Sequence, residues 1–80
     1  MPRFFLHLRD HGERIEDTTG AEFPSLIAAR AEAIKAAREM MAENLRLGLP
    51  LDHKQIEICD AQGQPIEEVR FSDVLKAIDE

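Results

Sequence analysis

Hydrophobic and polar residues alternate with a period of two near the start of the chain. Over residues 3–9 the side chains divide between two faces, Phe4, Leu6 and Leu8 on one and Phe5, His7 and Arg9 on the other. This period is typical of a half-buried β-strand. Asp10-His11-Gly12 predicts a turn, and a short second strand over 13–17 carries one apolar residue, Ile15. The pattern predicts an N-terminal hairpin, followed by a brief extended stretch over 21–23 that ends before Pro24.

A helical period replaces the alternation at residue 25. Ser25 is a favourable N-cap, and Gly48 followed by Pro50 is a favourable end, so we expect a helix up to Leu47. Its length of about 34 Å would carry one end beyond the sheet of so small a domain. The expected buried stripe follows spacings of three, four and seven: Ile27, Ala31, Ile34, Met41 and Leu45. We expect Leu26, Ala33, Ala37 and Met40 to widen this stripe on one side.

A second hairpin follows the helix. Residues 55–60 alternate, Gly63 marks the turn, and residues 65–71 form the returning strand. Ile66 and Val69 are three residues apart, which predicts a β-bulge near Glu67-Glu68. Ser72 is expected to cap a short last helix over 73–78. The predicted fold is a single α+β domain over 1–80, a two-layer sandwich with an antiparallel sheet of about four strands (β-β-α-β-β and a short C-terminal helix). The long helix covers one face, and the strand order stays open.

Composition narrows the class of protein. The 80 residues carry a net charge of −6 and one cysteine, Cys59. No segment approaches the ~18 apolar residues of a membrane span, and the N-terminus lacks the apolar core of a signal peptide. A single cysteine cannot form an internal disulfide and fits a reducing compartment. We therefore expect a cytoplasmic protein that does not enter a membrane.

Several short segments occur in a recognisable order: Pro2-Arg3-Phe4-Phe5, His7-x-Arg9-Asp10, Gly20-x-Glu22, the run from Ala29 to Ala33, and Asp60-x-x-Gly63 before a strand that ends at Phe71. Together they resemble a family of small uncharacterised proteins abundant in rhizobia and related alphaproteobacteria. The similarity covers nearly the whole chain. That family has no assigned activity, so the resemblance implies an identity and no mechanism. The family more often has a small or β-branched residue at the position of Cys59, which argues against a shared cysteine chemistry.

The residue types that carry chemistry are few. His7, His11 and Asp10 are possible metal ligands, but one histidine lies in the strand and the other in the turn, so we do not expect them to converge. His53 is far away in the sequence. Glu57 and Asp60 would raise the pKa of Cys59, which favours an inert, half-buried thiol. We expect no catalytic residue, no metal site and no cofactor, and hence no enzyme.

Interaction is the function that the pattern favours. Phe5 is expected on the sheet face that the helix leaves open, where pairing with a second copy or another protein would cover it. Arg30 and Arg38 lie within the expected helix stripe, with stems along the core edge and heads in water; Arg30 could pair with Glu57 or Asp60. We predict a non-enzymatic interaction module that forms a homodimer or binds an unidentified protein. The candidate interface residues are Phe5, His7, Arg9, Arg30 and Arg38.

The alternative is a regulator that contacts nucleic acid or a nucleic-acid-acting partner, as antitoxins do. Arg3, Phe5, His7 and Arg9 share one strand, and such a basic-aromatic face could stack bases and hold phosphates. The net charge of −6 repels a polyanion, so direct nucleic-acid binding is the less favoured of the two interactions. A small metal-binding protein is a further, weaker alternative.

Overall fold

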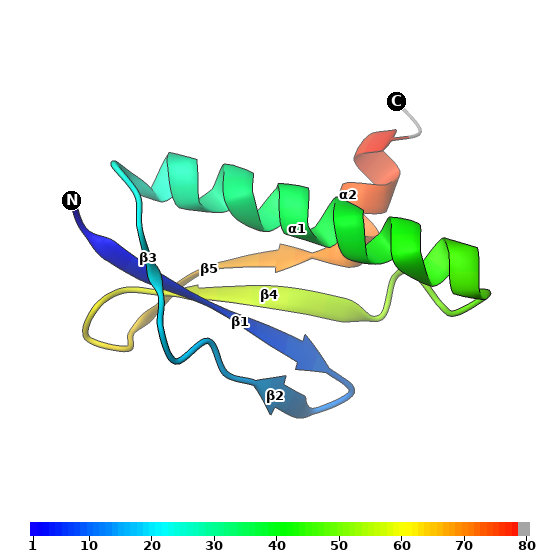
Figure 1. Cartoon of the computed structure of the whole chain (residues 1–80), viewed down its shortest axis with the longest axis horizontal. Helices are drawn as coiled ribbons and strands as arrows, with labels where there is room; N and C mark the ends of the chain where they lie inside the picture. The colour runs from blue at the N-terminus through cyan, green and yellow to red at the C-terminus, as the bar shows by residue number, and fades with distance from the viewer. Residues whose placement is uncertain (79–80) are drawn as a thin grey trace.

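The computed structural model of the chain describes residues 1–78, with the side chains of 1–77, as a sheet covered on one face by a long helix (Figure 1). The elements are β1 (Arg3–Asp10), β2 (Glu13–Ile15), β3 (Ala21–Glu22), α1 (Leu26–Leu47), β4 (Lys54–Cys59), β5 (Pro65–Arg70) and α2 (Phe71–Ile78). The molecule measures 37 × 28 × 17 Å. The α+β class, the antiparallel sheet, the long helix and the short last helix are all confirmed.

The strand order is β2-β1-β4-β5, and β3 pairs with the start of β1. All pairs are antiparallel. The two hairpins therefore join through β1 and β4, from Phe5 opposite Cys59 to Asp10 opposite Lys54. The register of β4 and β5 shifts between Ile58 and Cys59. The predicted bulge thus exists, but its extra residue is Ile66, just before the expected Glu67-Glu68.

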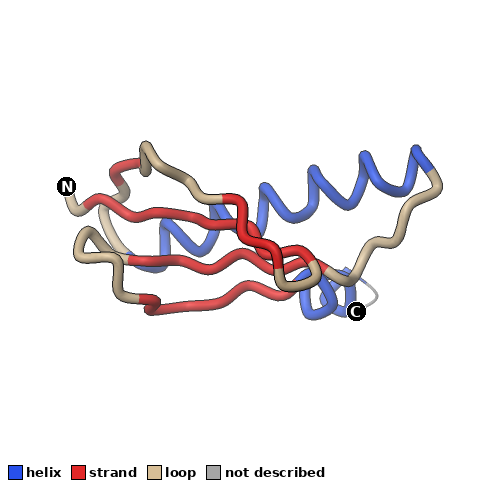
Figure 2. Tube along the Cα trace, turned by 90° about the horizontal axis from the view of Figure 1, so that it is seen from below, coloured by secondary structure: helices blue, strands red, loops and turns tan. Residues whose placement is uncertain are grey.

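Both ends of α1 follow the predicted capping. The Ser25 hydroxyl accepts a hydrogen bond from the Ala28 amide at 3.2 Å. Gly48 has a φ of 72°, and the Leu49 amide donates to the Asn44 carbonyl at 2.8 Å. Figure 2 shows that the C-terminal end of α1 extends past the strands, as its length predicted.

The buried face of α1 differs from the expected stripe. The buried side chains are Ala29, Ala33, Ala37, Met41 and Asn44. Ile27 and Leu45, which we expected inside, are 82% and 69% exposed. Relative to the expected stripe, the buried face is turned by about 100° around the helix axis. It is now centred on Ala33 and Ala37, which were expected only to widen the stripe. Alanines let the helix approach the sheet closely, because the large side chains of the core come mainly from the strands and α2.

Those large side chains include Phe4, Ile56, Ile58, Val69, Phe71 and Val74, all buried. Helix α2 begins at Phe71, directly after β5, so Ser72 lies inside the helix and does not cap it. The fully buried Phe71 ring is what anchors this junction. The side chain of Ile78 lies outside the described residues. Within the described part of the chain, no helix is long and apolar enough to cross a membrane.

Candidate functional site

The segment between β2 and β3 is hydrogen-bonded to the edge of β1 that faces away from β4. Asp17 is its centre: the Leu6 amide donates to Oδ2 at 3.2 Å, and the Thr19 and Gly20 amides donate to Oδ1 at 3.2 and 2.9 Å. The Asp17 amide in turn donates to Nδ1 of His7 at 3.1 Å. His7 is therefore buried, although a solvent-facing position was expected.

The ionisation of Asp17 matches this role. Burial raises the pKa of its carboxyl group, but the Gly20, Leu6 and Thr19 amides and the nearby His7 outweigh burial, so the pKa lies below its ordinary value. Asp17 and His7 act together as a structural clasp. The clasp replaces strand pairing along the middle of β1, between the residues that pair with β3 and those that pair with β2.

Phe5 lies on the uncovered sheet face, where the alternation placed it, but it is only half-exposed. Its ring stacks on His7 with centroids 6.4 Å apart. Gly20 passes so close that an added Cβ would lie 2.8 Å from the Phe5 ring. The segment around Gly20 therefore covers part of the face that was expected to be open.

Two cations of this face, Arg9 and Arg14, form ion pairs, whereas Arg3 donates from Nη1 to the Thr19 carbonyl at 3.0 Å. Arg9 Nε lies 3.3 Å from Glu57 Oε2, and Arg14 Nη2 lies 3.1 Å from Glu57 Oε1. Cys59 is fully buried, beyond the half-burial expected, and its thiol is 3.5 Å from Glu57 Oε1. Burial raises the pKa of Cys59, and hydrogen bonding to Glu57 raises it further. The thiol is held in its neutral, unreactive form at neutral pH.

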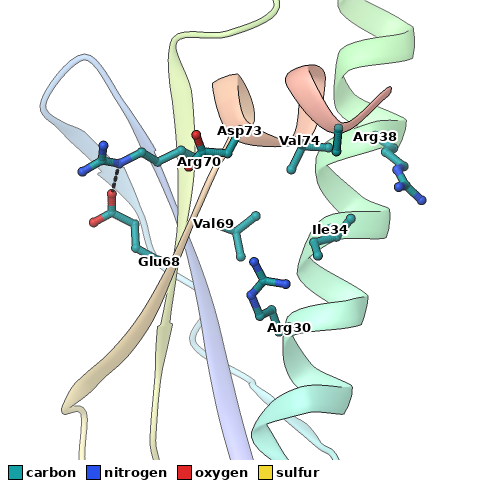
Figure 3. Close-up of a pocket in the computed structure, with 9 residues that line it drawn as sticks. Arg30, Ile34, Arg38, Glu68, Val69, Arg70, Asp73 and Val74 are labelled. Atoms are coloured by element: carbon teal, nitrogen blue, oxygen red, sulfur yellow. Dashed lines mark hydrogen bonds and ion pairs between the residues drawn. The ribbon is translucent and has the colours of Figure 1, made fainter. Parts of the chain in front are cut away.

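Arg30 and Arg38 are both exposed and flank a hollow of about 200 Å³ between α1, β5 and α2 (Figure 3). Arg30 extends between Ile34 and Val69, whereas Arg38 points away. Arg30 Nε lies 3.9 Å from Glu67 Oε2, so its acidic neighbour is neither of the two considered from the sequence. Because Glu68 and Asp73 also line the hollow, its charges are mixed and it offers no concentrated anion site.

A second depression, the leucine groove, runs between the C-terminal half of α1, the following loop and α2. Its volume is about 280 Å³, and its walls are Arg38, Met41, Ala42, Leu45, Leu51 and Leu75. Leu45 in its wall is 69% exposed, and Leu47 at the end of α1 and Leu49 in the loop after it are 57% and 51% exposed. Sequence reasoning missed this surface because it placed Leu45 in the core. The available signal was the length of the helix, which exceeds the sheet.

The histidines converge differently from the arrangement considered from the sequence. His7 belongs to the clasp, whereas His11 and His53 meet at Asp10, with ligand atoms all within 4.8 Å of one another. The β1–β4 register explains this meeting: Asp10 lies opposite Lys54, so the next residue of each segment, His11 and His53, also face each other.

Comparison with known proteins identifies a family and no activity. Searches of curated proteins and of solved structures find no significant match to the chain. A family profile matches residues 3–72, which is nearly the whole described chain. The chain therefore belongs to the family described as Domain of unknown function (DUF6894).

Proposed function

We propose that this protein is a small, non-enzymatic interaction module that self-associates through the leucine groove. The supporting observation is the exposure of three leucines, Leu45, Leu47 and Leu49, at the C-terminal end of α1 and in the loop after it, with Leu45 in the wall of an apolar groove. Exposed apolar surface of this kind is unfavourable in water unless a partner covers it.

A second copy of the chain is the occupant that the arrangement supports. Leu45 forms part of the wall of this groove together with Met41, Leu51 and Leu75, and Leu47 and Leu49 follow it in the sequence as exposed apolar residues. A two-fold axis uses the same patch on both subunits, so the leucine groove of one copy can pack against that of the other. Arg38 at the rim has no ion-pair partner among the described residues and would stay at the solvent edge of such an interface.

The sheet face around Phe5 leaves less free surface for a partner to contact. Phe5 is half-covered, His7 is buried in the clasp, and Arg9 is paired with Glu57. The nucleic-acid alternative needs free cations on β1, and the ion pair of Arg9 with Glu57 leaves only Arg3 there without a carboxylate partner among the described residues. We therefore place self-association at the end of α1.

The test is the mass of the protein in solution, measured by light scattering and sedimentation across a concentration series. The wild type is expected at twice 9.1 kDa. Leu45→Glu introduces a charge into the wall of the leucine groove and is expected to give monomers with an unchanged helical signal in circular dichroism. Ile27→Glu is the matched control, because Ile27 is an exposed apolar residue of the same helix at its other end.

A monomeric wild type at a few hundred micromolar would refute self-association. A dimeric Leu45→Glu variant would refute the groove as its site. If Phe5→Glu, and not Leu45→Glu, gave monomers, the sheet face would be the interface instead.

A further inference from the structure

We propose that Asp10, His11 and His53, here named the histidine cluster, form a binding site for a divalent transition-metal ion, with Zn²⁺ as the expected occupant. The cluster lies at the end of the sheet where the β1–β2 turn meets the residue before β4 (Figure 1). It is separate from the leucine groove and does not depend on self-association.

The distances suit metal ligation. His53 Nε2 is 3.2 Å and His11 Nε2 is 3.7 Å from Asp10 Oδ1. Tetrahedral zinc with bonds of about 2.0–2.1 Å places its ligand atoms about 3.3 Å apart, between the two observed values. The imidazole rings are nearly parallel, at 19°, with centroids 4.8 Å apart. A small rotation of the exposed His11 side chain would therefore complete a three-ligand set.

One unpartnered buried atom in the cluster, Asp10 Oδ1, points to a missing ligand. Asp10 Oδ1 is buried and accepts no well-aligned hydrogen bond, although His53 Nε2 is close to it. His53 Nδ1 is also buried without a partner, but it is the ring nitrogen other than the one beside Asp10. Among the described residues, neither ring takes part in a hydrogen bond of good geometry, so both imidazoles are available to a metal. A cation bound at Oδ1 would satisfy a carboxylate oxygen that otherwise carries an unfavourable loss of solvation.

The turn that holds His11 is itself unusual. His11 has a φ of 51° and Gly12 a φ of 84°, as in the two-residue type I′ turn of a hairpin. Asparagine or glycine usually occupies the first of these positions, and a histidine there carries a conformational cost. The turn places its imidazole beside that of His53, which is the arrangement that metal binding needs.

The donor set selects the class of ion. Two imidazoles and one carboxylate suit Zn²⁺, Cu²⁺ and Ni²⁺, whereas Mg²⁺ and Ca²⁺ prefer oxygen ligands. Three protein ligands leave one position for water or for a side chain of a partner. Lys54 Nζ lies 4.0 Å from Asp10 Oδ2 and repels a bound cation, so it should limit the affinity.

The test is calorimetric titration of the tag-free protein with ZnCl₂, and separately with MgCl₂. We expect one saturable Zn²⁺ site per chain and no Mg²⁺ binding. His53→Phe keeps the planar ring, His11→Asn keeps the left-handed turn, and each should weaken Zn²⁺ binding at least about 10-fold. Lys54→Gln should strengthen it. Asp52→Asn is the matched control for loss of a neighbouring negative charge and should change the affinity less than 2-fold.

Nitrogen chemical shifts provide an independent readout. Long-range ¹⁵N–¹H spectra should show Zn²⁺ shifting one ring nitrogen in each of His11 and His53 and none in His7. The proposal is refuted if Zn²⁺ gives no saturable binding below about 1 mM, if either histidine variant binds like the wild type, or if only His7 shifts. The monomeric Leu45→Glu variant should bind Zn²⁺ normally, so this site and the proposed dimer can fail separately.

Discussion

Replacement of Asp17 by alanine should remove the clasp that holds the β2–β3 segment against β1. The carboxylate accepts hydrogen bonds from the Leu6, Thr19 and Gly20 amides, at 3.2, 3.2 and 2.9 Å. The Thr19 amide is exposed and can bond to water in the variant. The Leu6 and Gly20 amides are partly buried and would lose an acceptor that water replaces poorly.

The expected loss follows from these two amides. A hydrogen bond to a charged group contributes about 1.5–3 kcal/mol, and partial exposure lowers that value, so Asp17→Ala should lower the free energy of unfolding by about 2–4 kcal/mol. Asp17→Asn retains one carbonyl oxygen but turns an amide donor towards the Leu6 N–H, and should cost about 1–2 kcal/mol. In a domain of this size each kcal/mol lowers the Tm by about 4–8 °C.

The free energy of unfolding that Asp17→Ala removes should depend on pH in a defined direction. The pKa of Asp17 is lowered in the folded protein from an ordinary value of 3.8. Its contribution is therefore complete above pH 3.8 and is lost as the pH falls through the folded pKa. The difference between wild type and Asp17→Ala should shrink only in this acidic range and stay constant between pH 5 and about pH 7.

Urea unfolding followed by circular dichroism measures these differences. Glu16→Gln, a neighbouring exposed acid, is the control and should stay within about 0.5 kcal/mol of the wild type. The reasoning would be refuted if Asp17→Ala were as stable as this control. A difference that persists undiminished at pH 2 would refute the assignment to the ionised carboxylate.

The remaining predictions concern packing and the thiol. Ala33→Leu should destabilise the domain by about 1–3 kcal/mol because it overfills the contact between α1 and the sheet, whereas Ile27→Ala should cost less than about 0.5 kcal/mol; thermal unfolding compares them. Gly20→Ala should lower the free energy of unfolding by more than about 1 kcal/mol, because the φ of Gly20 is 70° and an added Cβ would meet the Phe5 ring. Full stability of this variant in urea would contradict the close approach. Cys59 should react slowly with a thiol reagent at pH 7 and quickly in urea, since burial raises its pKa; rapid labelling of the native protein would contradict this.

Local signals along the chain were sufficient for the elements. Ser25 and Gly48 defined α1, because capping depends on residues a few positions apart. Alternation likewise placed Phe4 inside and Phe5 on the opposite sheet face. The exposure of the Phe5 ring was overestimated because Gly20, fifteen residues later, covers part of it. No local pattern encodes that contact.

The candidate sites depended on distant contacts. The leucine groove combines α1 with Leu51 and Leu75, and it exists only because α1 turns its alanines towards the sheet. Periodicity defines an apolar stripe but cannot choose between two overlapping stripes, since that choice depends on the volume the sheet and α2 already fill.

The sequence by itself determined the element order, the ends of the long helix, the α+β class and the absence of a segment apolar enough to span a membrane. The tertiary structure decided that β1 pairs with β4, and this pairing brings His11 and His53 together at Asp10. Hairpins form from neighbouring residues, whereas the edge through which two hairpins join is selected by the packing of the whole core. The chemistry of a site that spans this join therefore becomes visible only in the folded chain.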